Sequence, residues 1–141
     1  MMKKNLYYFL FISGVSIVLS QDQTVGLFLN TTAAAPGYTL FAPMSYNVTY
    51  LIDNNGELVQ SWFSDYRPGL SVYFLENGDL LRTRRLQGQF FQTGGRGGGF
   101  EILDWGGELV WEFDYFSDQY WQHHDIESLP SGNVLLIAWE Y

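Results

Sequence analysis

Two copies of a unit of about 50 residues make up most of the sequence, and this repeat limits what the chain can fold into. Residues 51–59 (LIDNNGELV) match residues 102–110 (ILDWGGELV) at an offset of 51. Residues 75–81 match residues 129–135 at an offset of 54, so the second copy has gained three residues in between. A unit that recurs at this period cannot bury its apolar faces alone, so we expect neighbouring copies to stack on one another.

Each copy is predicted to form β-strands. From Tyr38 onward, clusters of aromatic and β-branched residues alternate with turn signals, and no stretch has a sustained apolar period of 3.6 residues. The turn signals are Asn55-Gly56, Asn77-Gly78, Gly106-Gly107 and Ser131-Gly132. Each copy therefore reads as strand, turn, strand, longer connection, strand, turn, strand. Four antiparallel strands in a unit of this length are the size of one β-propeller blade.

We expect an all-β fold, namely a β-propeller fragment of about two four-stranded antiparallel blades in residues 21–141. A closed propeller takes about four to eight blades, or roughly 200–400 residues at this blade size. The chain supplies about two, and its last apolar strand at residues 134–139 stands almost at the end of the sequence. We therefore expect the N-terminal part of a longer protein. A complete two-sheet β-sandwich is the alternative.

The first twenty residues, 1–20, have the features of a signal peptide. Two lysines precede an apolar run at residues 6–19, and Val18 and Ser20 supply small residues for a cut before Gln21. Fourteen residues span only ~21 Å as a helix, which is short of a ~30 Å hydrocarbon core, so a membrane anchor is disfavoured. We expect an exported protein of the periplasm or the extracellular space, without membrane attachment after cleavage.

Charge and cysteine content exclude several classes of site. The formal net charge is -8, and without the two leader lysines five arginines face fifteen acidic residues. A surface this acidic repels phosphate backbones, so we expect no nucleic-acid partner. The chain has no cysteine, which excludes disulfides and Cys-ligated metal sites.

The clearest difference between the two copies involves the only histidines, His123 and His124. Residues 122–127 (QHHDIE) stand in the place of residues 68–73 (PGLSVY), so that His124 replaces Leu70. Adjacent residues of a strand point to opposite faces, and we therefore expect at most one imidazole to face a given cavity.

Three interpretations of the histidines stay open. One histidine could line a central channel as nucleophile, base or anion contact. The pair could bind a metal with Asp125 or Glu127, but two ligands on one strand face need i, i+2 spacing, at which His124 has Ile126. The third interpretation is ordinary polar residues at the start of a strand. We expect no metal and no cofactor.

Arginines give two further candidates. The glycine-rich run at residues 94–99 contains Arg96, lacks a Gly-Lys-Ser/Thr ending and precedes a strand, so it is no P-loop. A connection between blades is the favoured interpretation, and the functional alternative holds Arg96 over a channel mouth as an anion contact. Arg82 and Arg84 share one strand face while Arg85 points to the other, and we expect salt bridges for at least two of these three.

Four segments together resemble the bacterial arylsulfotransferase family. They are residues 24–29 (TVGLFL), 36–43 (PGYTLFAP), 50–53 (YLID) and 123–136 (HHDIESLPSGNVLL). The likeness covers nearly all of the chain after the leader, and the His-Asp-x-x-x-Leu-Pro-x-Gly-Asn-Val run is its most specific part.

This resemblance implies a six-bladed propeller enzyme of the bacterial envelope. Such enzymes move a sulfuryl group from an aryl sulfate donor to a phenolic acceptor through a transient sulfohistidine. His124, with His123 as second choice, corresponds to an early channel histidine that contacts substrate or stabilises charge, and Arg96 is a substrate-binding candidate. The attacking histidine is expected in later blades, so these residues alone are expected to be inactive. A non-catalytic secreted propeller and a quinoprotein-like oxidoreductase are the alternatives, and the oligomeric state is not predicted.

Overall fold

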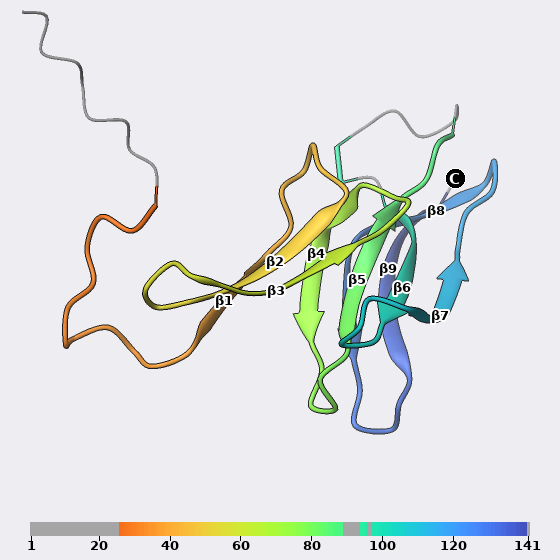
Figure 1. Ribbon diagram of the computed structural model, residues 1–141. Helices are drawn as coiled ribbons and strands as arrows, with labels where there is room; N and C mark the ends of the chain where they lie inside the picture. Colours follow the sequence, from red (N-terminus) through yellow and green to blue (C-terminus); the bar gives the residue numbers. More distant parts are fainter. Residues whose placement is uncertain (1–25, 89–93, 96, 141) are drawn as a thin grey trace, which may run out of the picture.

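The computed structural model describes residues 26–88, 94–95 and 97–140, and in this part the chain forms nine β-strands and no helix (Figure 1). The strands are β1 (Tyr38–Phe41), β2 (Val48–Asp53), β3 (Leu58–Phe63), β4 (Pro68–Phe74), β5 (Leu80–Arg85), β6 (Gly98–Leu103), β7 (Leu109–Asp114), β8 (Tyr120–Ser128) and β9 (Val134–Glu140). The expected all-β class is confirmed. The predicted leader at residues 1–20 lies outside the described residues. In the described part, no helix is long and apolar enough to cross a membrane.

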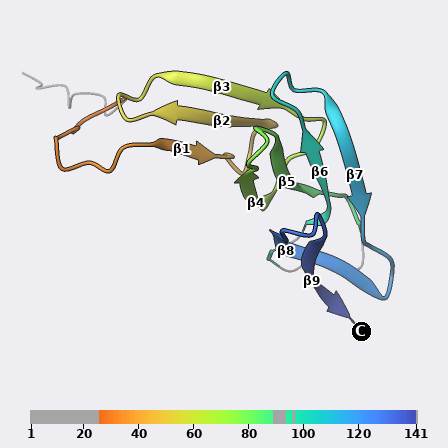
Figure 2. The same cartoon turned by 90° about the horizontal axis from the view of Figure 1, so that it is seen from below.

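The strands form three antiparallel sheets that follow one another in chain order. They are β1-β2-β3, β4-β5-β6-β7 and β8-β9. Figure 2 shows them as successive layers, with the four-stranded sheet between the other two. We expected each copy of the repeat to form its own four-stranded sheet, and this grouping was wrong. The four-stranded sheet joins the second half of the first copy to the first half of the second, because β5 pairs directly with β6.

All four predicted glycine turns are present and share one geometry. In each turn the glycine amide donates to the carbonyl oxygen three residues earlier, at 2.9–3.0 Å. The glycines have φ between 77° and 91°, a conformation that residues with a Cβ rarely adopt. These glycines are Gly56, Gly78, Gly107 and Gly132. The turns lie at the opposite end of the strands from the longer connections, which gather at the upper end of Figure 1.

A first apolar core lies between the β1-β2-β3 sheet and the four-stranded sheet. Leu51 and Trp62 of the first sheet pack there against Leu80 and Leu103 of the second. Trp62 is fully buried, and its indole Nε1 donates to the carbonyl oxygen of Asp104 at 2.9 Å. Trp62 therefore holds the first sheet against the second, because its ring packs in the apolar core and its N–H group is hydrogen-bonded.

A second core lies between the four-stranded sheet and the β8-β9 sheet, and it repeats the pattern of the first. Ile102, which is equivalent to Leu51 in the repeat, packs there. Val134, which is equivalent to Leu80, packs there as well. The buried members of this core are Leu81, Phe100 and Ile126. Because equivalent positions meet at both junctions, each sheet is placed on the next in the same way.

Buried ion pairs lie on one face of the four-stranded sheet. Arg82 is completely buried, with its Nε 3.5 Å from Glu101 Oε1, and its guanidinium donates to a backbone carbonyl at 2.9 Å. Arg84 is paired with Glu101 at 3.8 Å and with Glu112 and Asp114. The predictions that these two arginines share a face and form salt bridges are confirmed.

Candidate functional site

The histidines lie on an irregular part of β8, the first strand of the third sheet. The pairing of β8 with β9 shifts register between Gln122 and Ile126. The pairing of β4 with β5 shifts in the same way between Pro68 and Val72, which are the equivalent positions at an offset of 54. The repeat therefore places the same bulge in the first strand of two successive sheets. A bulge of this kind redirects side chains, and bulges are frequent next to active sites.

The bulge brings the two imidazoles together. The ring centroids of His123 and His124 are 4.3 Å apart, the planes are inclined by 70°, and the two Nδ1 atoms are in hydrogen-bond contact. We predicted that the two side chains would point to opposite faces, and this was wrong because the alternation of a regular strand is interrupted here. His123 also lies against Trp139 of β9, whose ring centroid is 4.7 Å away.

The contact between the rings affects where the imidazole hydrogens lie. Burial and the neighbouring His124 both lower the pKa of His123, so this imidazole is neutral at neutral pH. A neutral ring that donates its Nδ1 hydrogen carries no hydrogen on Nε2. When His123 is the donor to His124, its Nε2 lone pair is therefore able to accept a proton or to attack an electrophile.

Asp125 follows the histidines but does not orient them. Its carboxylate accepts a hydrogen bond from the Tyr73 hydroxyl at 2.7 Å and one from the Ile126 amide at 3.0 Å. The bond from Tyr73 is the main reason why the pKa of Asp125 is lowered, and the same bond raises the pKa of Tyr73 to about 12. The acid therefore ties β8 to β4.

Two polar side chains that the sequence did not single out hold the bulge in place. Gln122 is completely buried, and its Oε1 accepts from the amide of Gly98 at 2.9 Å. Its Nε2 donates to the carbonyl oxygen of Asp125 at 3.4 Å, across the bulge. The hydroxyl of Ser71 on β4 donates to the carbonyl oxygen of His124 at 2.9 Å. The available signal for Ser71 was its place in the repeat, where it is equivalent to Asp125.

Gly95, which lies between β5 and β6 in the sequence, is beside His123. A Cβ added at Gly95 would lie 2.6 Å from His123 Cε1, so this glycine allows a close approach. Arg96 lies outside the described residues, and its role stays a prediction. Within the described ranges, no group of three or more His, Asp or Glu side chains is placed to hold a metal ion.

The site is thus a pair of imidazoles in contact, on a bulge that is held by buried side chains. Comparison with family models, curated proteins and solved structures found no match to this chain. The likeness to arylsulfotransferases therefore stays a prediction from the residues.

Proposed function

We propose that this chain is the N-terminal part of an exported β-propeller enzyme that moves a sulfuryl group from an aryl sulfate ester to a phenolic acceptor. The observation that carries the proposal is the position of the two histidines. They occupy the β8 bulge, where the equivalent β4 bulge has Leu70, and the two strands are neighbours through the bond from Ser71 to His124. First strands that lie side by side are what lines the axis of a propeller.

The propeller is supported by the way in which the sheets are stacked. Both junctions bury equivalent positions, so the same step from sheet to sheet is repeated. Phe113 is the equivalent of Trp62, which closes the first junction, yet Phe113 lines an open apolar groove of about 440 Å³. We propose that further strands of the third sheet pack in this groove and that more copies of the unit complete the ring.

The proposed chemistry has two steps. In the first, an imidazole nitrogen attacks the sulfur of the donor, an N–S bond forms, and the S–O bond to the phenolate breaks. In the second, the acceptor phenol oxygen attacks the same sulfur, the N–S bond breaks, and the phenol proton passes to a base. We place the attacking histidine in a later blade. The pair described above contacts the substrate, where a neutral imidazole can accept the phenol proton or hydrogen-bond a sulfuryl oxygen.

The test is a transfer assay on the complete protein that the proposal implies. It is incubated with 4-nitrophenyl sulfate with and without a phenol, and nitrophenol release is followed. We expect phenol-dependent release, and a loss of at least about tenfold in kcat/KM for His124→Ala, because a lost charge-stabilising contact costs about 1.4 kcal/mol or more. The matched control is Leu70→Ala on the equivalent bulge, which is expected to keep full activity. Absence of phenol-dependent release, together with a His124→Ala variant that equals its parent, contradicts the proposal.

A non-catalytic secreted propeller that binds ligands is the second candidate. It is favoured by Asp125, which is bound to Tyr73 and does not orient an imidazole. In that case the bulge serves to join β8 to β4. This candidate predicts that later copies of the unit carry Leu or Ser in the register of His124 and Asp125, as Leu70 and Ser71 do in the first copy, and that aryl sulfates are not turned over.

A further inference from the structure

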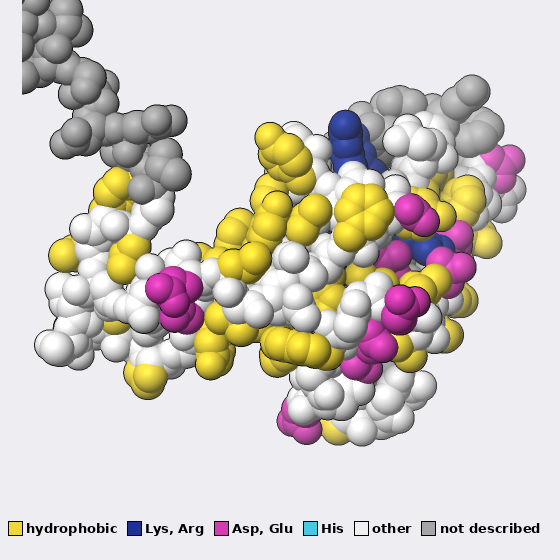
Figure 3. Space-filling view, in the orientation of Figure 1, with side chains coloured by type: hydrophobic (Ala, Val, Ile, Leu, Met, Phe, Trp, Pro, Cys, Tyr) yellow, Lys and Arg dark blue, Asp and Glu magenta, His cyan; other side chains and the backbone are white. Residues whose placement is uncertain are grey.

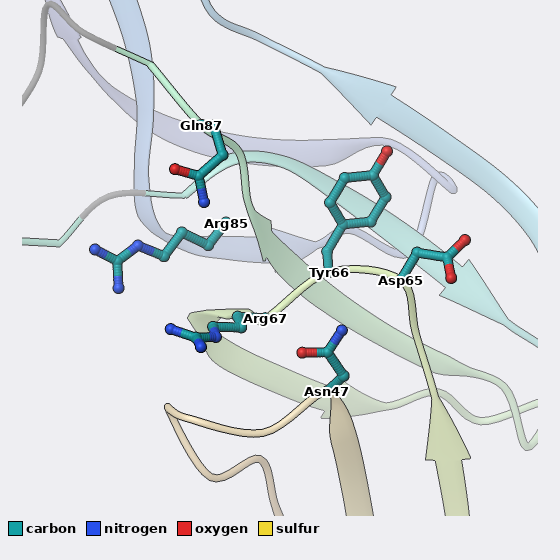
Figure 4. A pocket seen from close by; sticks show the side chains of 6 residues that line it. All are labelled: Asn47, Asp65, Tyr66, Arg67, Arg85 and Gln87. Carbon is teal, nitrogen blue, oxygen red and sulfur yellow. The ribbon is translucent and has the colours of Figure 1, made fainter.

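Arg67 and Arg85 are neighbours at the upper end of the four-stranded sheet. Arg67 directly precedes β4, Arg85 ends β5, and the amide of Arg85 donates to the carbonyl oxygen of Arg67 at 2.8 Å. Since Pro68 pairs with Arg84, the same register sets Arg67 opposite Arg85. Figure 4 shows both side chains extending to the same side. The backbone ladder therefore holds two guanidinium groups next to each other.

The positive charges of Arg67 and Arg85 repel each other unless an anion neutralises them. Like charges directly opposite on neighbouring strands destabilise a sheet. In the described part of the chain, neither Arg67 nor Arg85 has an ion pair or a side-chain hydrogen bond, although the sequence has fifteen acidic residues. Arg82 and Arg84, by contrast, are both paired with carboxylates. Figure 3 shows basic side chains near the top of the molecule, and this basic patch is set apart from the acidic side chains.

The pair borders a cavity of about 610 Å³. This volume is within the range of pockets that take small organic molecules, and it exceeds what a single inorganic ion fills. The lining residues are Asn47, Asp65, Tyr66, Arg67, Arg85 and Gln87. The one acid among them, Asp65, points away from the two guanidinium groups in Figure 4. Gln87 is exposed and offers an amide donor on the same side as the arginines.

We propose that Arg67 and Arg85 bind the oxyanion of a small organic molecule, a sulfate ester, phosphate ester or carboxylate, whose organic part occupies the cavity. A guanidinium presents two parallel N–H donors that match a pair of oxyanion oxygens. An oxyanion between the two arginines converts a repulsive pair into two attractive ones. This site uses neither histidine, and it does not depend on the proposed sulfuryl transfer.

The experiment measures binding by titration calorimetry on the full chain at fixed ionic strength. The probes are phenyl sulfate, phenyl phosphate and benzoate, which distinguish the three oxyanions, and phenol is the uncharged control. We expect saturable 1:1 binding of at least one anion and none of phenol. Arg67→Gln and Arg85→Gln should each weaken that binding about tenfold or more, because a charge-assisted hydrogen bond contributes at least this factor.

A matched variant controls for net charge. Gln119→Glu also lowers the charge by one, at an exposed position in the β7–β8 connection that does not line the cavity, and it should bind as the parent does. Arg67 is exposed and outside the strands, so Arg67→Gln should fold normally, with an unfolding midpoint in the absence of anion that is unchanged or higher. His124→Ala should keep the affinity of the parent, which separates this site from the proposed activity. The proposal is overturned if no anion binds, if both arginine variants bind like the parent, or if Gln119→Glu weakens binding equally.

Discussion

Glu101 is predicted to be the acidic residue on which the stability of the four-stranded sheet depends most. Its side chain is 3% exposed and lies between two buried arginines, Arg82 and Arg84. Arg84 has two further acidic partners, but within the described residues Glu101 is the only ion-pair partner of Arg82. Burial lowers the pKa of Arg82, and the neighbouring charge of Glu101 opposes this effect. Glu101→Gln keeps the shape of the side chain and removes its charge.

Glu101→Gln is expected to lower the unfolding free energy because it leaves Arg82 as a buried charge without an ion-pair partner in the described part of the chain. Removing one partner of a buried pair leaves an uncompensated charge, which costs about 3–5 kcal/mol of unfolding free energy. Arg82 retains its hydrogen bond to a backbone carbonyl, so we expect the lower end, about 3 kcal/mol. The matched control is Glu112→Gln: this acid is 49% exposed and shares Arg84 with other carboxylates, so about 0–1 kcal/mol is expected.

Urea unfolding followed by tryptophan fluorescence measures both variants. At a slope of about 1.5 kcal/mol/M, Glu101→Gln should lower the midpoint by about 2 M, and Glu112→Gln should lower it by less than about 0.7 M. Replacing both partners, Arg82→Met with Glu101→Leu, should recover most of the loss, since no charge is then buried. Equal midpoints for the two single variants would refute the reasoning.

Two further predictions concern the contact between β4 and β8 and the turns. The lowered pKa of Asp125 means that its bond to Tyr73 adds stability above the normal carboxyl pKa, and that this stability is lost as the pH falls through the lowered value. Tyr73→Phe should therefore cost about 1 kcal/mol at pH 7, with a difference from the parent that shrinks on acidification; a pH-independent difference in urea unfolding would contradict this. Gly132 has φ 83° and open space around it, so Gly132→Ala should cost about 1–2 kcal/mol through backbone strain alone. Gly94 has equally open space and no such φ, so an unfolding midpoint for Gly94→Ala as low as that of Gly132→Ala would show that strain is not the cause.

Local signals predicted local structure well. A glycine in an Asn-Gly, Gly-Gly or Ser-Gly pair marks a turn that requires positive φ, and Gly56 and Gly132 adopt it. The two-residue period of a β-strand likewise predicted that Arg82 and Arg84 share one face, and both contact Glu101. These features depend on a few adjacent residues, which a single sequence contains.

Pairing between strands was harder to predict. The repeat shows which segments are equivalent, but it does not show which neighbours share a sheet, because β4-β5 could pair with the strands before it or after it. The bulge at His123 and His124 also has no local signal, since it is stabilised by Gln122 and by Ser71 from another sheet. The pairing of Arg67 with Arg85 depends on the same long-range register. Each of these features needs the three-dimensional arrangement.

The pairing of β5 with β6 has a consequence for how the duplicated unit can be handled. The hydrogen-bonded ladder from Leu80–Leu103 to Arg85–Gly98 crosses the boundary between the two copies. Cutting the chain at that boundary would separate β5 from β6 and leave both strands with unpaired edges, so the two copies would not be released as complete sheets. The duplicated segment and the four-stranded sheet are therefore offset by two strands, and backbone hydrogen bonds join the second copy directly to the first.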